Sequence, residues 1–142
     1  MEDRYLFKAK TAQIVGIYNN GLEDGVWVHG SLRCDVGKYT IFQFETERAD
    51  YVEYEIDPST ICQCTGLKDK NGNLIWENDI VNCLAEECCG YIGWNEDEAG
   101  FYFNVLLEDG TYEEEHIYDY VDCMDVIGNV FDNPELLGRN DE

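Results

Sequence analysis

Lysine and arginine are scarce in this sequence. Nine basic residues stand against 31 acidic ones, so the formal net charge is −22. Surfaces that bind nucleic acid or anionic lipid are built from clustered Lys and Arg. This deficit argues against nucleic acid as a direct partner and against docking on an anionic membrane.

Long apolar runs are missing as well. No stretch approaches the roughly 20 apolar residues of a membrane-spanning helix. The sequence opens on Glu2, Asp3 and Arg4 rather than on a secretory signal, so we expect a cytoplasmic protein. The seven cysteines are an odd number, and without an export signal they favour reduced thiols over a disulfide framework.

The residues that are present suffice for a folded core. A length of 142 residues corresponds to one domain. Hydrophobic residues make up 44% and aromatic residues 13%, with ten tyrosines, which argues against disorder despite the large charge.

The acidic residues concentrate in the second half of the chain. Between Lys70 and Arg139 there are 17 acidic residues and no Lys or Arg. Like charges on a compact body repel one another, so this stretch needs an explanation. Two stay open: the acids serve solubility alone, or they imitate a phosphate backbone and occupy the basic cleft of a nucleic-acid-binding protein.

Four clusters of acids are the candidate partner-binding residues. They fall between predicted strands, so we expect them on exposed loops, forming an anionic coat on one side of the molecule. The candidates are Glu86, Glu87, Glu96, Asp97, Glu98, Glu108, Asp109, Glu113, Glu114 and Glu115.

The residue pattern predicts a mainly β protein. Turn signals recur about every 8–12 residues, a spacing typical of a small barrel or sandwich. Asn71-Gly72 predicts a tight turn, and residues 134–137 predict one closing helical turn. Runs of β-branched and aromatic residues predict strands at 26–30, 39–44, 51–56, from 80 onward, and at 90–94, 100–105 and 125–130.

The residue spacing after Asp69 argues against a calcium-binding loop. Residues 69–73 begin like such a loop, with oxygen ligands at alternate positions. Leu74 and Ile80 stand where the loop needs Gly and a bidentate Glu, so we expect a turn there and no calcium.

Zinc binding stays open as a less favoured alternative. Structural zinc sites pair their ligands in two knuckles, and the cysteines here lack that spacing. We expect thiols that bind no metal. The residues that could contribute are Cys62, Cys64, Cys83, Cys88 and Cys89, with His29, His116 and Cys123 as completions.

Residues suited to catalysis are few. Ser31 and Ser59 are the only serines, and neither lies in a nucleophile motif. A pair of Cys123 with His116 is conceivable, but nothing in the sequence orients it. We therefore expect no enzymatic activity, no cofactor and no metal.

Two long motifs resemble the YopX-like family of phage and prophage proteins. The first is QCTGLKDKNG at residues 63–72 followed by IWENDIV at 75–81, and the second is VIGNVFDNPELL at 126–137. Residues 4–10 and 27–32 are a weaker match. The resemblance implies a mostly β fold with a small Src-homology-3-like barrel in the C-terminal half and a mobile-element origin in bacteria. It implies no established biochemical activity.

Two positions depart from the family pattern. Cys64 stands where an aromatic residue is usual, and Asn78 stands where Gly is usual. Asn tolerates the same left-handed backbone conformation, so we expect that turn to survive.

Taken together, these features predict a single YopX-like domain over residues 1–142. Within it we expect an N-terminal β lobe at 1–57, packed with a small barrel at 58–142. The predicted function is a phage- or prophage-encoded acidic module that binds a basic host or phage protein in the bacterial cytoplasm. Its most specific form would be a nucleic-acid mimic that inhibits a defence protein, as anti-restriction and anti-CRISPR proteins do. The alternative is a homo-oligomeric structural or accessory phage protein.

Overall fold

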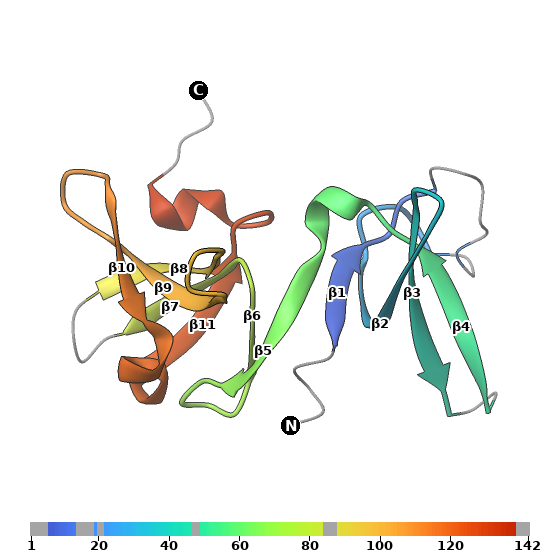
Figure 1. The fold of residues 1–142 in the computed structure, drawn as a ribbon, viewed down its shortest axis with the longest axis horizontal. Helices are drawn as coiled ribbons and strands as arrows, with labels where there is room; N and C mark the ends of the chain where they lie inside the picture. The colour runs from blue at the N-terminus through green and yellow to red at the C-terminus, as the bar shows by residue number, and fades with distance from the viewer. Residues whose placement is uncertain (1–5, 14–18, 20–21, 47–48, 84–87, 139–142) are drawn as a thin grey trace. The chain divides into compact units, whose positions relative to one another are not determined.

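The computed structural model describes residues 6–13, 19, 22–46, 49–83 and 88–138, and Figure 1 shows their fold. Within these ranges the chain forms β-strands and short 3-10 helices and no α-helix, which confirms the prediction of a mainly β protein. Its contacts divide it into two compact units, Met1–Cys64 and Thr65–Glu142. We call them the N-terminal and C-terminal units.

One strand, β5, belongs to both units, because the division falls inside its range Cys62–Lys68. It is a member of a six-stranded antiparallel sheet with the order β4-β3-β2-β1-β5-β6. The other strands of this sheet are β1 (Phe7–Lys10), β2 (Trp27–Asp35), β3 (Lys38–Glu45), β4 (Asp50–Glu55) and β6 (Leu74–Trp76).

The core of the N-terminal unit follows from alternation along these strands. Ala9 pairs with Val28, and Ile41 pairs with Tyr54, so each pair presents its side chains on one face of the sheet. All four are buried, together with Val52 and Ile56. After β4, the carboxylate of Asp57 accepts a hydrogen bond from the backbone N–H of Ser59 (3.0 Å) and caps the 3-10 helix η2 (Pro58–Thr60).

The C-terminal unit holds a five-stranded antiparallel sheet with the order β10-β9-β8-β7-β11. Its buried centre contains Val81, Ile92, Phe103 and Met124. The strands are β7 (Asp79–Cys83), β8 (Cys88–Asn95), β9 (Gly100–Leu106), β10 (Tyr112–His116) and β11 (Met124–Asn129), and the 3-10 helices are η4 (Ile117–Asp119), η5 (Val121–Cys123) and η6 (Pro134–Leu137).

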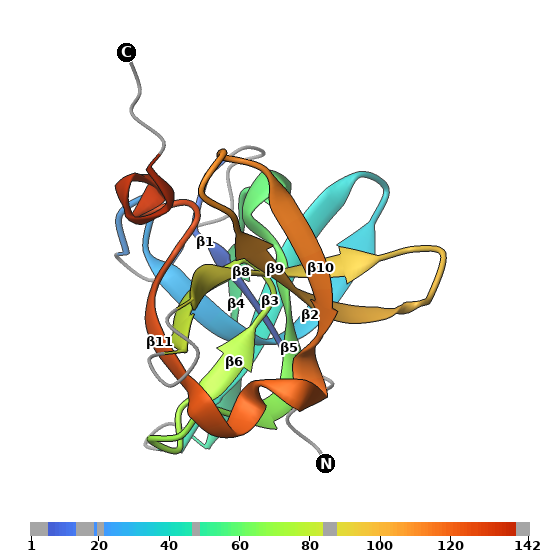
Figure 2. The same ribbon diagram turned by 90° about the vertical axis from the view of Figure 1, so that its left-hand side faces the viewer.

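The expected closed barrel does not form among the described residues. The five-stranded sheet ends at β10 on one side and at β11 on the other. The chain passes from β10 to β11 through η4 and η5, so no strand joins the two edges. Figure 2 looks onto this unit, in which β8, β9 and β10 follow one another as an antiparallel meander.

Asn78 precedes β7 in the left-handed conformation, with a φ of +72°. Its N–H donates to Ile92 O (2.7 Å), and its carbonyl accepts from Val130 N (2.9 Å). The prediction that Asn preserves this turn is therefore confirmed. The turn connects the start of β7 to both β8 and the residue that follows β11.

The buried carboxylate of Asp69 fastens the β5–β6 turn to β11. Its Oδ1 accepts hydrogen bonds from the backbone N–H groups of Asn71 (2.9 Å) and Asn73 (2.8 Å). Its Oδ2 accepts from the N–H of Val126 in β11 (3.0 Å). Burial by itself would raise the pKa of Asp69, but these backbone hydrogen bonds outweigh it and hold the pKa below the usual range. The oxygens that resembled a calcium ligand thus satisfy backbone donors.

Replacing this carboxylate should weaken the C-terminal unit. We expect Asp69→Asn to lower the free energy of unfolding by about 2–3 kcal/mol, because charge-assisted hydrogen bonds are lost and one buried N–H faces an amide NH₂. The folded-state pKa lies below the unfolded value near 4, so the stabilisation is present above pH 4 and disappears as the pH falls through the folded pKa. Denaturant unfolding of both proteins from pH 7 to pH 2 measures this. A difference that stays constant with pH would contradict it.

A second prediction concerns the β2–β3 hairpin, whose two-residue turn is Val36-Gly37. Both residues have positive φ, +52° and +76°, and Val36 is 98% exposed. A β-branched residue is strained in this conformation, whereas Asn tolerates it. We expect Val36→Asn to raise the free energy of unfolding by about 1 kcal/mol. Val36→Thr keeps the β-branch and serves as the control, so an equal gain from Thr would show that backbone strain is not the cause.

Candidate functional site

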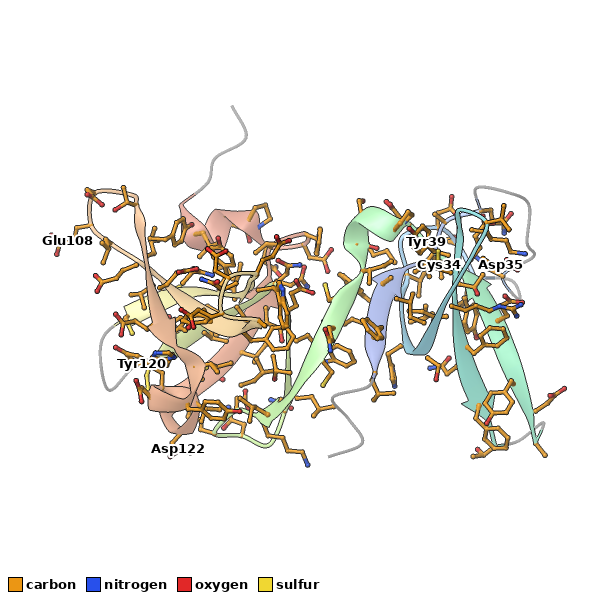
Figure 3. The ribbon with its side chains drawn as sticks, in the orientation of Figure 1. Cys34, Asp35, Tyr39, Glu108, Tyr120 and Asp122 are labelled. Carbon is orange, nitrogen blue, oxygen red and sulfur yellow. A yellow bond between two sulfur atoms is a disulfide. The ribbon has the colours of Figure 1, made fainter. Side chains whose placement is uncertain are left out.

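The candidate acids that the structure describes lie on β10 and on the two turns that join β8, β9 and β10. Glu86 and Glu87 lie outside the described residues. Glu96, Asp97 and Glu98 occupy the β8–β9 turn, and Glu108 and Asp109 occupy the β9–β10 turn. Figure 3 shows Glu108 at the tip of that second turn. The remaining three, Glu113, Glu114 and Glu115, lie within β10.

The expectation that these last three acids lie on a loop is wrong. Strand β10 pairs with β9 over its whole length, with Glu113 opposite Val105 and Glu115 opposite Phe103. It is an edge strand of its sheet. Because side chains alternate along a strand, Glu114 lies on one face of the sheet while Glu113 and Glu115 lie on the other.

On the first face, Asn95 forms hydrogen bonds with two of the acidic residues. Its Nδ2 donates to both carboxylate oxygens of Glu114 (3.0 and 3.2 Å), and its Oδ1 accepts from the backbone N–H of Glu98 (2.9 Å). Burial raises the pKa of Tyr102, and the charges of Glu98 and Glu114 raise that pKa further. Both carboxylates therefore act on the same tyrosine.

On the second face, Glu113 and Glu115 are close enough to share a hydrogen bond. That hydrogen bond raises the pKa of Glu115, burial and the charges of Glu113 and Asp119 add to the rise, and the neighbouring His116 offsets part of it. Asp119 belongs to η4 and was not among the predicted residues. Only folding places Asp119 near Glu115, because η4 turns back after β10. We define the acidic edge as Glu98, Glu113, Glu114, Glu115 and Asp119.

The acids of the β9–β10 turn lie outside the acidic edge. The carboxylate of Asp109 accepts hydrogen bonds from the N–H (3.0 Å) and hydroxyl (2.6 Å) of Thr111, and these bonds hold its pKa below the usual range. The β8–β9 and β9–β10 turns lie at opposite ends of β9, roughly 20 Å apart for a strand of this length. The candidate acids among the described residues thus occupy two faces and two ends of the sheet, and these residues do not form the expected one-sided coat.

Two of the cysteines are joined. Cys83 at the end of β7 and Cys123 at the end of η5 form a disulfide, with their Cα atoms 5.2 Å apart. The expectation of reduced thiols is therefore wrong for this pair, and neither residue can act as a thiolate in this state. Among the described residues no group of three or more His, Cys, Asp or Glu side chains is arranged to hold a metal ion.

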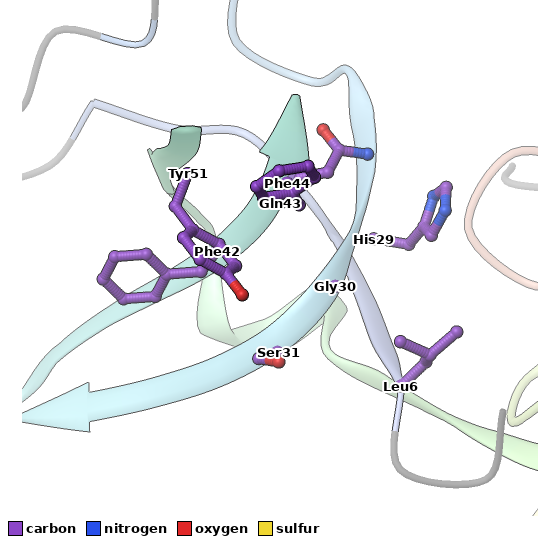
Figure 4. Close-up of a pocket in the computed structure, with 8 residues that line it drawn as sticks. All are labelled: Leu6, His29, Gly30, Ser31, Phe42, Gln43, Phe44 and Tyr51. Atoms are coloured by element: carbon purple, nitrogen blue, oxygen red, sulfur yellow. The ribbon is translucent and has the colours of Figure 1, made fainter. Parts of the chain in front are cut away.

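The N-terminal unit carries a hollow of about 330 Å³ that the sequence did not reveal (Figure 4). Phe44 and Tyr51 stand at its rim, with exposed fractions of 52% and 66% and ring centroids 5.2 Å apart in an edge-to-face arrangement. The guanidinium of Arg33 lies 5.8 Å from the ring of Phe42. The lining residues are Leu6, His29, Gly30, Ser31, Phe42, Gln43, Phe44 and Tyr51.

Gly30 is required in the floor of this hollow. A Cβ atom at this position would lie 2.0 Å from the carbonyl oxygen of Phe42, closer than any real contact. The close approach of β2 to β3 therefore depends on a residue without a side chain.

In the described residues no helix is long and apolar enough to cross a membrane.

Comparison with known proteins identifies the family. Among curated proteins no sequence matches this chain. A family model described as YopX protein matches residues 12–138, which include the N-terminal unit after β1, the described C-terminal unit and the whole acidic edge. The chain therefore belongs to the YopX family, as its two sequence motifs predicted.

Proposed function

We propose that this chain is a phage- or prophage-encoded module, without enzymatic activity, that binds a basic protein surface through its acidic edge. One observation carries the proposal. An edge strand bears carboxylates on both of its faces, and no Lys or Arg occurs from residue 71 to residue 138 to neutralise them. A partner with clustered Lys and Arg side chains would gain from this potential both in affinity and in rate of association.

The spacing of the charges supports the more specific form, a mimic of nucleic acid. A β-strand rises about 3.4 Å per residue, and one strand of duplex DNA carries a phosphate about every 3.4 Å along its axis. Glu113, Glu114 and Glu115 are consecutive in β10, so the strand carries one carboxylate per residue over this stretch, divided between its two faces. The proposed partner is a host defence protein whose basic cleft normally holds nucleic acid.

The fold of the C-terminal unit belongs to the same proposal. We infer a Src-homology-3-like arrangement whose sheet curls toward closure. The last strand, β11, returns to pair with the first, β7, and leaves β8, β9 and β10 as a meander. This order, with η4 and η5 directly before the last strand, is the observation that supports the inference.

Neutralising the acidic edge should weaken binding. The chain is immobilised, incubated with a bacterial lysate, and eluted with sodium chloride or with short duplex DNA. We expect captured proteins rich in Lys and Arg that both agents release. The isosteric variant Glu113→Gln/Glu114→Gln/Glu115→Gln should bind the purified partner about tenfold more weakly at low salt, with a shallower dependence on salt.

The matched control removes three exposed acids elsewhere, in the variant Glu23→Gln/Asp122→Asn/Glu135→Gln. It changes the net charge equally and should bind like the original chain. Equal loss in both variants would show that net charge alone matters. Release by salt but not by DNA would contradict mimicry while leaving an acidic protein-binding module.

A second candidate function rests on the hollow of the N-terminal unit. Exposed aromatic side chains such as Phe44 and Tyr51 mark surfaces that bind other proteins, and a second copy of this chain is one such partner. A self-associating accessory protein should then sediment as a dimer or larger species, and Phe44→Ser/Tyr51→Ser should shift it to the monomer. A monomer at micromolar concentration in the unchanged chain would rule this candidate out.

A further inference from the structure

We propose that Cys83, Cys88 and Cys123 form a thiol–disulfide exchange site, in which Cys88 is the attacking thiol. The inference does not depend on the acidic edge or on the identity of a partner. It rests on three cysteines that the sheet gathers although they lie on three different elements, β7, β8 and η5.

The pairing of β7 with β8 places Cys88 beside the disulfide. Cys83 and Cys88 are direct partners in the antiparallel register. Directly opposed residues present their side chains on the same face, with Cβ atoms about 4.5–5.5 Å apart. That face is the core face, because Cys83 is fully buried and Cys88 packs against the core cluster that contains Val81 and Met124.

The other end of the disulfide lies on the same side. Cys123 is followed by Met124, the first residue of β11, and Met124 is the register partner of Cys83 on the strand edge opposite β8. Cys83 therefore lies between two neighbours, one bonded to it and one carrying a thiol. Cys89 pairs with Asn82 and projects to the opposite face, so it does not share this position.

The exchange balances without any further reactant. The Cys88 thiol loses its proton to water, and the resulting thiolate attacks Sγ of Cys83. An S–S bond forms between Cys83 and Cys88, the Cys83–Cys123 bond breaks, and Cys123 leaves as a thiolate that takes up a proton. One disulfide is present before and after, so there is no net oxidation or reduction.

The exchange would change which segments are tied together. The Cys83–Cys123 bond joins residues 40 apart in sequence and holds the end of η5 against β7. A Cys83–Cys88 bond would cross-link only the β7–β8 hairpin, leaving η4 and η5 held by noncovalent packing. That packing includes Tyr120 against Phe103, with ring centroids 5.3 Å apart. The exchange would thus remove the covalent link between β7 and the segment that joins β10 to β11.

Alkylation of the full chain tests the proposal. The protein is held at pH 8 without reductant, then treated with N-ethylmaleimide, digested and analysed by mass spectrometry. We expect two isomers: a Cys83–Cys123 disulfide with alkylated Cys88, and a Cys83–Cys88 disulfide with alkylated Cys123. Alkylation of Cys123 should fall by about tenfold or more in Cys88→Ser, because the attacking thiol is lost.

Cys89→Ser is the matched control, since it removes the neighbouring thiol on the opposite face and should leave both isomers. In this variant, a disulfide-linked peptide that contains residues 88 and 89 can be bonded only through Cys88. Circular dichroism checks that both variants fold, and the isomers of the unchanged chain are measured directly in any case. A single isomer in the unchanged chain, the absence of any disulfide, or unaltered Cys123 alkylation in Cys88→Ser would each overturn the proposal.

Discussion

The three hydrogen bonds accepted by Asp69 are the interaction on which the C-terminal unit depends. The β5–β6 turn must expose backbone N–H groups, and β11 needs an acceptor for Val126. A single carboxylate satisfies both requirements and thereby fixes the hairpin against the edge strand that pairs with β7. Strand β7 in turn pairs with β8, β8 with β9, and β9 with β10. In a chain with 31 acidic residues, one of the least exposed carboxylates links two segments that lie far apart in the sequence.

Local signals in the sequence were sufficient for most of the fold. Strands β3, β4, β8 and β9 are rich in β-branched and aromatic residues, and the Asn71-Gly72 turn and the helical turn η6 have distinctive residues. Strand β10 was missed because a run of Glu has low strand propensity. Its pairing with β9 outweighs that preference. The strand β1 was missed because four residues give too short a pattern.

The candidate site could be predicted only in part, because the missing information is three-dimensional. Sequence shows that Glu113, Glu114 and Glu115 are consecutive, but only strand geometry separates them onto two faces. Asp119 raises the pKa of Glu115 only because the turn of η4 brings it near that side chain. Likewise, the disulfide joins residues 40 positions apart, and no spacing rule identifies such a pair. The family motifs, in contrast, are continuous in sequence and identified the family directly.

The position of the unit boundary inside β5 has a consequence for how such genes can recombine. Cys62 and Gln63 pair with β1, whereas the rest of the strand continues into the hairpin with β6. A crossover at codon 64 would keep the register of β5, but it would place side chains from two parental genes side by side within one sheet. Exchange of whole units between related genes should therefore be selected against at this point, and the two halves should be inherited together.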